Sequence, residues 1–134
     1  MVDPDVVVRR LREIGRRLAE LRALHAGGRR SDPAVQAQVE RHLQVAIQGA
    51  IDVALHVLAD DTDRTPDDYG SAFLLLAEVG VIGPELATRL RLAAGLRNLL
   101  VHAYLDIDPD RLWRHLDHLD DLDAFALAVA EYLD

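Results

Sequence analysis

The sequence of 134 residues contains no cysteine and no lysine. Without cysteine, disulfide bonds, thiolate metal sites and cysteine nucleophiles are excluded, so any chemistry must use other side chains. Because lysine is absent, all fifteen cationic side chains are arginines. Planar guanidinium groups suit bidentate contacts with phosphate, although codon bias in a GC-rich genome explains the same composition equally well.

Aromatic residues are also scarce, at 4% of a chain that is half hydrophobic. The apolar content is mostly Ala, Leu and Val in short groups at helical spacing, which indicates packed helices. No stretch approaches the roughly 20 uninterrupted apolar residues of a membrane span, and the segment 1–12 is charged where a signal peptide needs an apolar centre. We therefore expect a soluble, cytoplasmic protein that makes no membrane contact and forms a single domain over residues 1–134.

The net charge of −8 is unusual for a protein that binds nucleic acid, because cationic side chains normally neutralise the phosphates. The charge is unevenly distributed along the chain. Residues 1–50 contain nine arginines and six acidic residues, whereas residues 51–134 contain six arginines and seventeen acidic residues. Any contact with phosphate is therefore expected to use the first half.

Three Asp-Pro pairs, at residues 3–4, 32–33 and 108–109, predict the starts of helices. In each pair the Asp can cap the helix, and the Pro can take the first helical position without losing a needed N–H donor. Apolar periodicity predicts helices over 4–26, 33–59, 69–79, 84–103 and 109–133, with an acidic loop over 60–68. The expected fold is all-α, an antiparallel bundle of four to five helices.

The second and fourth predicted helices have pronounced apolar faces, so both are expected to lie in the core. The face of the second is formed by Leu43, Ile47, Ala50, Ala54, Val57 and Leu58, and that of the fourth by Leu86, Leu90, Ala93, Ala94, Leu96 and Leu100.

The densest polar group in an otherwise apolar helix lies near the end of the fourth, where Arg97 and Asn98 are followed by His102. Asn98 and His102 share a helix face, and Arg97 is one step round from Asn98. A histidine can transfer protons near neutral pH, an arginine can stabilise charge on a phosphate, and an asparagine can orient either group. These groups suit phosphodiester cleavage without a metal. Spacing alone favours the other interpretation, in which Arg97 and His102 cap the last carbonyls of the helix and pair with nearby acids.

This segment resembles the signature of HEPN-domain proteins, in which an Arg, often followed by a polar residue, precedes a His by four to six positions. Four residues separate Arg97 from His102, and the run from Val101 to Tyr104 is similar to the pattern of the HepT-like subfamily. The resemblance extends over most of the chain, through Glu40, Arg41, His42, Leu43, Ile47, Asp52, Pro66, Tyr69, Phe73, Leu76, Gly80 and Ile82.

The resemblance implies a metal-independent endoribonuclease, the toxin of a type VII toxin–antitoxin system, with a composite site at a homodimer interface. It implies that His102 is a general acid or base, that Arg97 stabilises the charge on the phosphate, and that Asn98 positions one of them. A cleft for RNA needs basic walls, for which Arg9, Arg16 and Arg41 are candidates. An arginine-rich helix face in solvent is the alternative.

The resemblance also implies a partner, an MntA-type nucleotidyltransferase antitoxin that transfers AMP to a tyrosine beside the site. Tyr104 holds the matching position. Added AMP would bring negative charge and bulk to the place where an RNA phosphate binds. The alternative function is a non-catalytic subunit of a nucleotidyltransferase that binds a nucleotide or the partner.

No cofactor or metal is predicted. His115 and His118 are three residues apart among aspartates, a spacing that could hold a metal, but an acidic helix often carries histidines on a solvated face. Asp52 and His56 are four apart on one predicted helix, which favours a structural pair.

Overall fold

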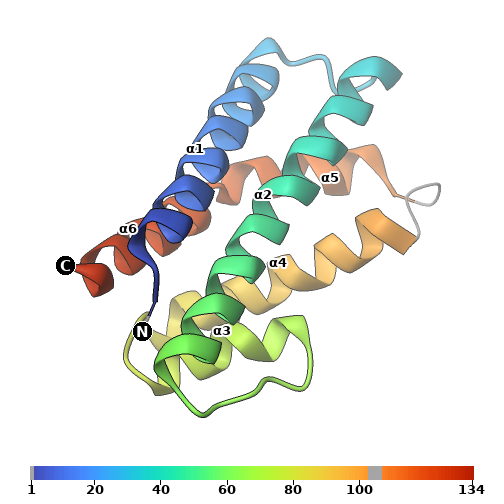
Figure 1. Cartoon of the computed structure of the whole chain (residues 1–134). Coiled ribbons are helices and arrows are strands. Elements are labelled where there is room, and N and C mark those ends of the chain that lie inside the picture. Colours follow the sequence, from blue (N-terminus) through green and yellow to red (C-terminus); the bar gives the residue numbers. More distant parts are fainter. Residues whose placement is uncertain (1, 103–106) are drawn as a thin grey trace.

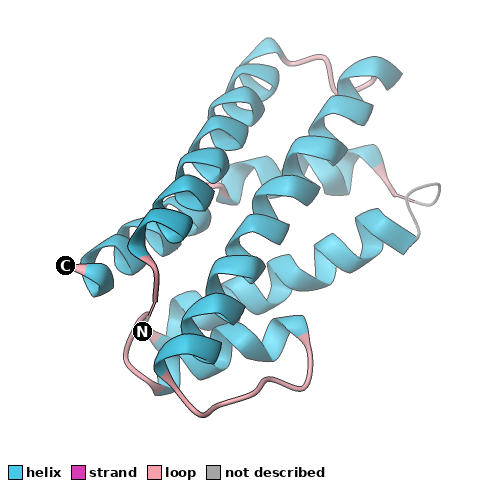
Figure 2. Ribbon diagram, viewed as in Figure 1, coloured by secondary structure: helices cyan, strands magenta, loops and turns pink. Residues whose placement is uncertain are grey.

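The computed structural model describes residues 2–102 and 107–134, and helices fill most of both ranges (Figures 1 and 2). Neither range contains a strand, and the all-α prediction is confirmed. The elements in chain order are α1 (Pro4–Gly27), α2 (Pro33–Asp61), α3 (Tyr69–Glu78), α4 (Pro84–His102), α5 (Pro109–His115), the short 3₁₀ helix η2 (Leu116–His118) and α6 (Asp120–Leu133).

The three Asp-Pro pairs start helices as predicted. The carboxylates of Asp3, Asp32 and Asp108 each accept a hydrogen bond from the backbone N–H two residues later, at 3.0, 2.9 and 3.0 Å. Each following proline is the first residue of its helix. The cap satisfies an N–H that would otherwise lack an acceptor, and the proline has none to lose, so both residues define the helix start.

The long helix α2 is the centre of the bundle and packs against α1, α3, α4, α5 and α6. All six residues predicted for its core face are buried, together with Val39, Ala46, Ile51 and Val53. By length and composition α2 could also cross a membrane, with a mean hydropathy of 1.3 over its most apolar 18 residues. Contact with helices on several sides accounts for this apolar composition, because a central core helix is apolar over much of its circumference.

Helices α3 and α4 pack against each other beside α2. Asp68 caps α3 in a capping box, accepting from the Ser71 backbone N–H at 2.7 Å while the Ser71 hydroxyl accepts from the Asp68 N–H at 3.1 Å. After α3 the chain turns through Gly80, whose φ of 86° is in the left-handed region. Glycine adopts this conformation without the steric penalty of a Cβ atom, which is why α3 ends here.

The prediction of one unbroken helix over 109–133 is wrong, because the chain forms α5, η2 and α6. The buried residues explain the difference. Leu116, Leu119, Leu122 and Phe125 are spaced by three and all face the core. In an α-helix three successive steps of three residues drift round to the opposite face, whereas a 3₁₀ turn keeps such residues aligned. The 3₁₀ turn at η2 removes this drift for the step from Leu116 to Leu119, so Leu116 stays on the same side as the buried residues that follow it. Phe125 then meets Phe73 of α3 edge to face, with ring centroids 5.7 Å apart.

The two ends of the described chain meet at the end of α2. The Asp61 carboxylate accepts from the Val2 backbone N–H at 3.0 Å and from the Tyr132 hydroxyl at 2.7 Å. Figure 1 shows both termini near this end of the bundle. Asp61 thus connects α2, α6 and the segment that precedes α1 through one side chain.

Candidate functional site

Arg97 lies on α4 and is held by contacts on several sides. Its Nε donates a hydrogen bond to Oε1 of Gln48 on α2 at 2.6 Å, and its Nη1 donates to Oδ1 of the adjacent Asn98 at 3.1 Å. Its Cζ atom lies 5.2 Å from the ring centroid of Tyr69, the first residue of α3. Three helices therefore fix this one guanidinium, which is partly buried.

The contacts continue from Gln48 to the first helix. Gln48 Nε2 donates to Asp52 Oδ1 at 2.9 Å, and Arg10 Nη1 donates to Asp52 Oδ2 at 3.3 Å. We call Arg10, Asp52, Gln48 and Arg97 the polar chain. It crosses from α1 through α2 to α4 and connects two cationic side chains through one carboxylate and one neutral amide.

His102 is the last residue of α4 and is exposed. Its side chain makes no hydrogen bond or ion pair with any residue in 2–102 or 107–134, and its exposure leaves the imidazole accessible to a substrate. Asn98 is one helical turn earlier on the same face and is also exposed. The structure thus brings Arg97 and Asn98 into direct contact and places His102 beyond them on the face that carries Asn98. Tyr104, the predicted AMP acceptor, lies outside the described residues.

Two open hollows adjoin Gln48 and Asn98, the two residues that bind Arg97. The first, of about 270 Å³, lies between α1 and α2, and its lining includes Arg10, Arg41, Gln48 and Asp52. The second, of about 350 Å³, lies between α3 and α4 and is lined by Tyr69, Arg91 and Asn98 among others.

The three arginines predicted to contact RNA differ in their surroundings. Arg41 lines the first hollow together with Arg10. Arg9 is exposed and lines a neighbouring hollow of about 260 Å³ with Arg10 and Glu13. Arg16 binds the Glu13 carboxylate on its own helix. The structure therefore gathers Arg9 and Arg41 around Arg10 and ties Arg16 to an acid.

Other arginines of the basic first half bind the acidic second half of the same chain. Arg22 on α1 binds Asp120 at 3.0 Å and also binds Asp123, both on α6, and Arg30 Nη1 lies 3.5 Å from Asp110 on α5. Part of the charge asymmetry seen in the sequence is therefore cancelled within the fold.

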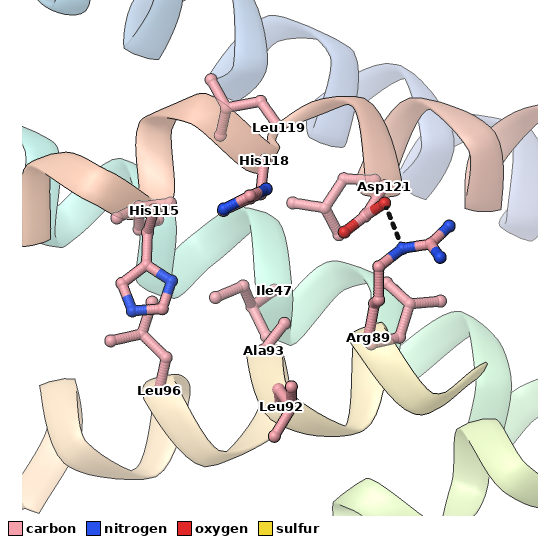
Figure 3. Close-up of a pocket in the computed structure, with 12 residues that line it drawn as sticks. Ile47, Arg89, Leu92, Ala93, Leu96, His115, His118, Leu119 and Asp121 are labelled. Carbon is pink, nitrogen blue, oxygen red and sulfur yellow. Dashed lines mark hydrogen bonds and ion pairs between the residues drawn. The ribbon is translucent and has the colours of Figure 1, made fainter. Parts of the chain in front are cut away.

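A third, more apolar pocket of about 320 Å³ lies between α4 and the segment from α5 to α6 (Figure 3). Its lining includes Leu92, Leu96, His115 and His118, while an ion pair of 2.8 Å between Arg89 and Asp121 closes one side. Burial is the main cause that lowers the pKa of His115 and so favours its neutral form. None of the three residues Arg97, Asn98 and His102 lines this pocket.

Among the residues that the structure describes, His115 and His118 belong to no group of three possible metal ligands. In the described part of the chain no three His, Asp or Glu side chains are placed to hold a metal ion together.

Sequence reasoning missed the contact of Gln48 with Arg97 and that of Arg10 with Asp52. The spacing of four between Gln48 and Asp52 was an available signal, because it places both side chains on one face of α2. The predicted pair of Asp52 and His56 is wrong. Asp52 instead binds Arg10 and Gln48, while His56 Nε2 lies 3.3 Å from Asp60 Oδ2.

The sequence of this chain is similar to those of known ribonucleases. Residues 8–129 match the family described as Ribonuclease HepT-like. A tRNA nuclease HepT from Aphanizomenon flos-aquae is 34% identical over 115 residues, which cover 84% of this chain and 78% of the relative. An mRNA nuclease HepT from Shewanella oneidensis is 27% identical over 124 residues, covering 90% and 93% of the two chains.

Among solved structures, the fold is similar to that of a tri-AMPylated HEPN toxin of Shewanella oneidensis in complex with an MNT antitoxin. The TM-score is 0.89 at 25% identity, and the match covers 96% of this chain and 99% of the toxin chain. The likeness thus spans the helical bundle from α1 to α6.

Proposed function

Because the chain belongs to the HepT-like ribonuclease family, we propose that it is the RNA-cleaving toxin of a type VII toxin–antitoxin pair. The observation that carries the proposal is the contact between Arg97 and Asn98 on α4, with the exposed His102 one turn beyond Asn98. In this proposal residues 1–134 form one HEPN domain that acts in the cytoplasm.

The proposed reaction is a transesterification within the RNA. The ribose 2′-oxygen attacks the adjacent phosphorus, the bond from phosphorus to the 5′-oxygen of the next nucleotide breaks, and a 2′,3′-cyclic phosphate and a 5′-hydroxyl form. His102 takes the proton from the 2′-hydroxyl or gives one to the leaving oxygen. Arg97 stabilises the additional negative charge on the phosphate in the transition state, and Asn98 orients Arg97 through their hydrogen bond.

We further propose that two copies of the chain pair along the exposed face of α4. Gly95 and His102 are seven residues apart, as are Leu92 and Leu99, so these four residues share one side of the helix. Leu92 is 67% exposed, which leaves a large apolar side chain on this face for a second copy to cover. Pairing on this face would bring two copies of His102 to one cleft, so that one can act as base and the other as acid.

The RNA phosphates would approach Arg97 past the hollow that Arg10 and Arg41 line, with Arg9 beside it. Cationic side chains near the reacting phosphate support binding through charge neutralisation. Because one relative is a tRNA nuclease and the other an mRNA nuclease, we propose RNA as the substrate and no narrower class.

The proposed restraint is a nucleotidyltransferase antitoxin of the MntA type that modifies Tyr104. In this step the tyrosine oxygen bonds to the α-phosphorus of ATP, and pyrophosphate leaves. Two observations support the proposal. Tyr104 follows His102 by two residues, and the similar Shewanella toxin is tri-AMPylated in its complex with the antitoxin.

Cleavage of a labelled RNA in EDTA by the purified chain tests the catalytic assignment. We expect Arg97→Ala and His102→Ala to lose cleavage but keep the helical fold. His118→Ala is the matched control, since it removes an exposed histidine on η2 that belongs to another pocket. Cleavage that survives in His102→Ala would refute the assignment. A wild-type chain that binds its partner but cleaves no RNA would favour the non-catalytic binding subunit.

The intact mass of the chain, with and without co-expression of the neighbouring nucleotidyltransferase, tests the restraint. We expect a gain of whole AMP units that disappears in Tyr104→Phe and persists in Tyr69→Phe. An unchanged mass in a complex that still forms would show that the antitoxin acts by covering the toxin alone.

A further inference from the structure

Gln48 stands out in the polar chain because its neutral amide lies between two charged groups. Its Oε1 accepts from Arg97 Nε at 2.6 Å, and its Nε2 donates to Asp52 Oδ1 at 2.9 Å. The three side chains come from α2 and α4, at a point where Gln48 is partly buried. Asp52 and Arg97 carry opposite charges and could form a direct ion pair. The position of the Gln48 amide between them therefore needs a physical explanation.

The two neighbours of Gln48 fix the direction of its amide. An ionised carboxylate only accepts hydrogen bonds and a guanidinium only donates them. If the amide were reversed, its NH₂ would face the guanidinium and its oxygen would face the carboxylate, and both hydrogen bonds would be lost. Asp52 therefore holds Oε1 toward Arg97, and Arg10 in turn balances the charge of Asp52 from α1 at 3.3 Å.

Because its amide is neutral, Gln48 binds Arg97 without compensating its charge. In the described part of the chain Arg97 makes no ion pair, and its hydrogen bonds to Gln48 and Asn98 use two of the five N–H donors of a guanidinium. Counted over the residues that the structure describes, three donors and the full positive charge remain for a ligand. The Tyr69 ring, 5.2 Å from Cζ, adds a contact that does not neutralise the group.

We propose that Gln48 is a positioning residue, which Asp52 orients so that it fixes the Arg97 guanidinium while leaving its charge free for a phosphate. The inference rests on the proposed function, in which Arg97 binds the scissile phosphate. It assigns to Gln48 and Asp52 a role in the reaction although neither touches the RNA.

Substitutions that separate geometry from charge test the proposal. Gln48→Ala removes the contact but keeps the charge of Arg97, so we expect kcat to fall about 100-fold, as for a misplaced catalytic group, with little change in KM. Gln48→Glu keeps a contact but pairs Arg97 with a carboxylate, so RNA binding itself should weaken. Asp52→Asn leaves the amide free to reverse, and we expect a smaller loss of kcat than in Gln48→Ala.

Binding without cleavage gives a second measurement. In a His102→Ala background, the dependence of the RNA dissociation constant on salt counts phosphate contacts, with a slope of about 0.7 per contact for single strands. We expect Gln48→Glu to reduce this slope by about one contact and Gln48→Ala to leave it unchanged. Gln38→Glu and Gln38→Ala are matched controls, because Gln38 is an exposed glutamine on the same helix.

The outcomes distinguish this inference from the proposed function. If Arg97→Ala cleaves RNA like the wild type, the proposed function fails and Gln48 has nothing to position. If Arg97→Ala is inactive but both Gln48 variants behave like the Gln38 controls, the positioning role alone is refuted. If the two Gln48 variants lower thermal stability, kcat and the salt slope alike, Gln48 is a structural residue and the inference is also overturned.

Discussion

Arg97 and Gln48 are 49 residues apart in the chain, and their side chains meet at 2.6 Å between α4 and α2. The contact joins a motif that is local in sequence to the central helix of the bundle. Because α2 packs on most other helices, the position of Arg97 depends on the whole core and not on α4 alone.

The ring of Tyr69 should matter more than its hydroxyl. A guanidinium over an aromatic face gains about 0.5–1 kcal/mol at an exposed site, and Tyr69 is 38% exposed. We therefore expect Tyr69→Phe to cleave RNA like the wild type and Tyr69→Leu to lose about two- to fivefold in kcat/KM. Equal rates for the two variants would show that the ring does not hold Arg97.

Self-association should depend on the exposed face of α4. Leu92→Glu places a charge where we propose that a second copy packs, so the chain should become monomeric in analytical ultracentrifugation and lose RNA cleavage. The matched control is Leu127→Glu on α6, where the leucine is 62% exposed. Neither change should alter the free energy of unfolding of the monomer by more than about 0.5 kcal/mol, because both sites are on the surface. A Leu92→Glu chain that still dimerises would place the interface elsewhere.

Mild acid should destabilise the fold through His42. Burial is the main cause that lowers the pKa of His42, Arg17 and Arg41 add to it, and Glu20 and Glu13 oppose it. Arg17 Nη1 lies 3.1 Å from His42 Nδ1, a contact that suits the neutral ring. The unfolded chain therefore binds a proton on His42 more tightly than the folded chain does. The free energy of unfolding falls as the pH drops below 6.5, the ordinary pKa of histidine in the unfolded chain, toward the lower pKa of His42 in the folded chain.

Urea titrations between pH 7.5 and 5.5 measure this effect. We expect His42→Gln to reduce the loss of stability over that interval, because glutamine stays neutral and still offers an acceptor to Arg17. Part of the loss should remain, since burial lowers the pKa of His115 in the same direction. A His42→Gln chain as sensitive to pH as the wild type would contradict the assignment.

Asp61 should stabilise both ends of the bundle. Asp61→Ala removes the acceptor of the Val2 N–H and of the Tyr132 hydroxyl, while Tyr132→Phe removes only one of these bonds. At about 1 kcal/mol for a typical hydrogen bond, we expect Asp61→Ala to cost at least twice as much stability as Tyr132→Phe. Chemical denaturation of the two single variants and the double variant tests this. The double variant should match Asp61→Ala, and additive losses would show that the residues act independently.

Local sequence chemistry was sufficient to predict much of this molecule. Asp-Pro pairs defined three helix starts because both residues act within one turn, and the apolar periodicity of α2 identified its core face because burial follows from helix geometry. The run from Arg97 to His102 was equally readable, since a short motif keeps its spacing on any helix.

Contacts between helices could not be predicted in the same way. The sequence suggested a pair of Asp52 and His56, yet the packing of α1 on α2 places Arg10 within hydrogen-bonding distance of Asp52. The 3₁₀ turn at η2 was also not predicted, although buried residues spaced by three occur there. The partner of Arg97 was likewise decided only by the fold, because pairing α4 with α2 depends on how the apolar faces of the whole bundle fit together. Sequence alone identified the groups that we propose for the chemistry, and tertiary packing decided how the arginine among them is held.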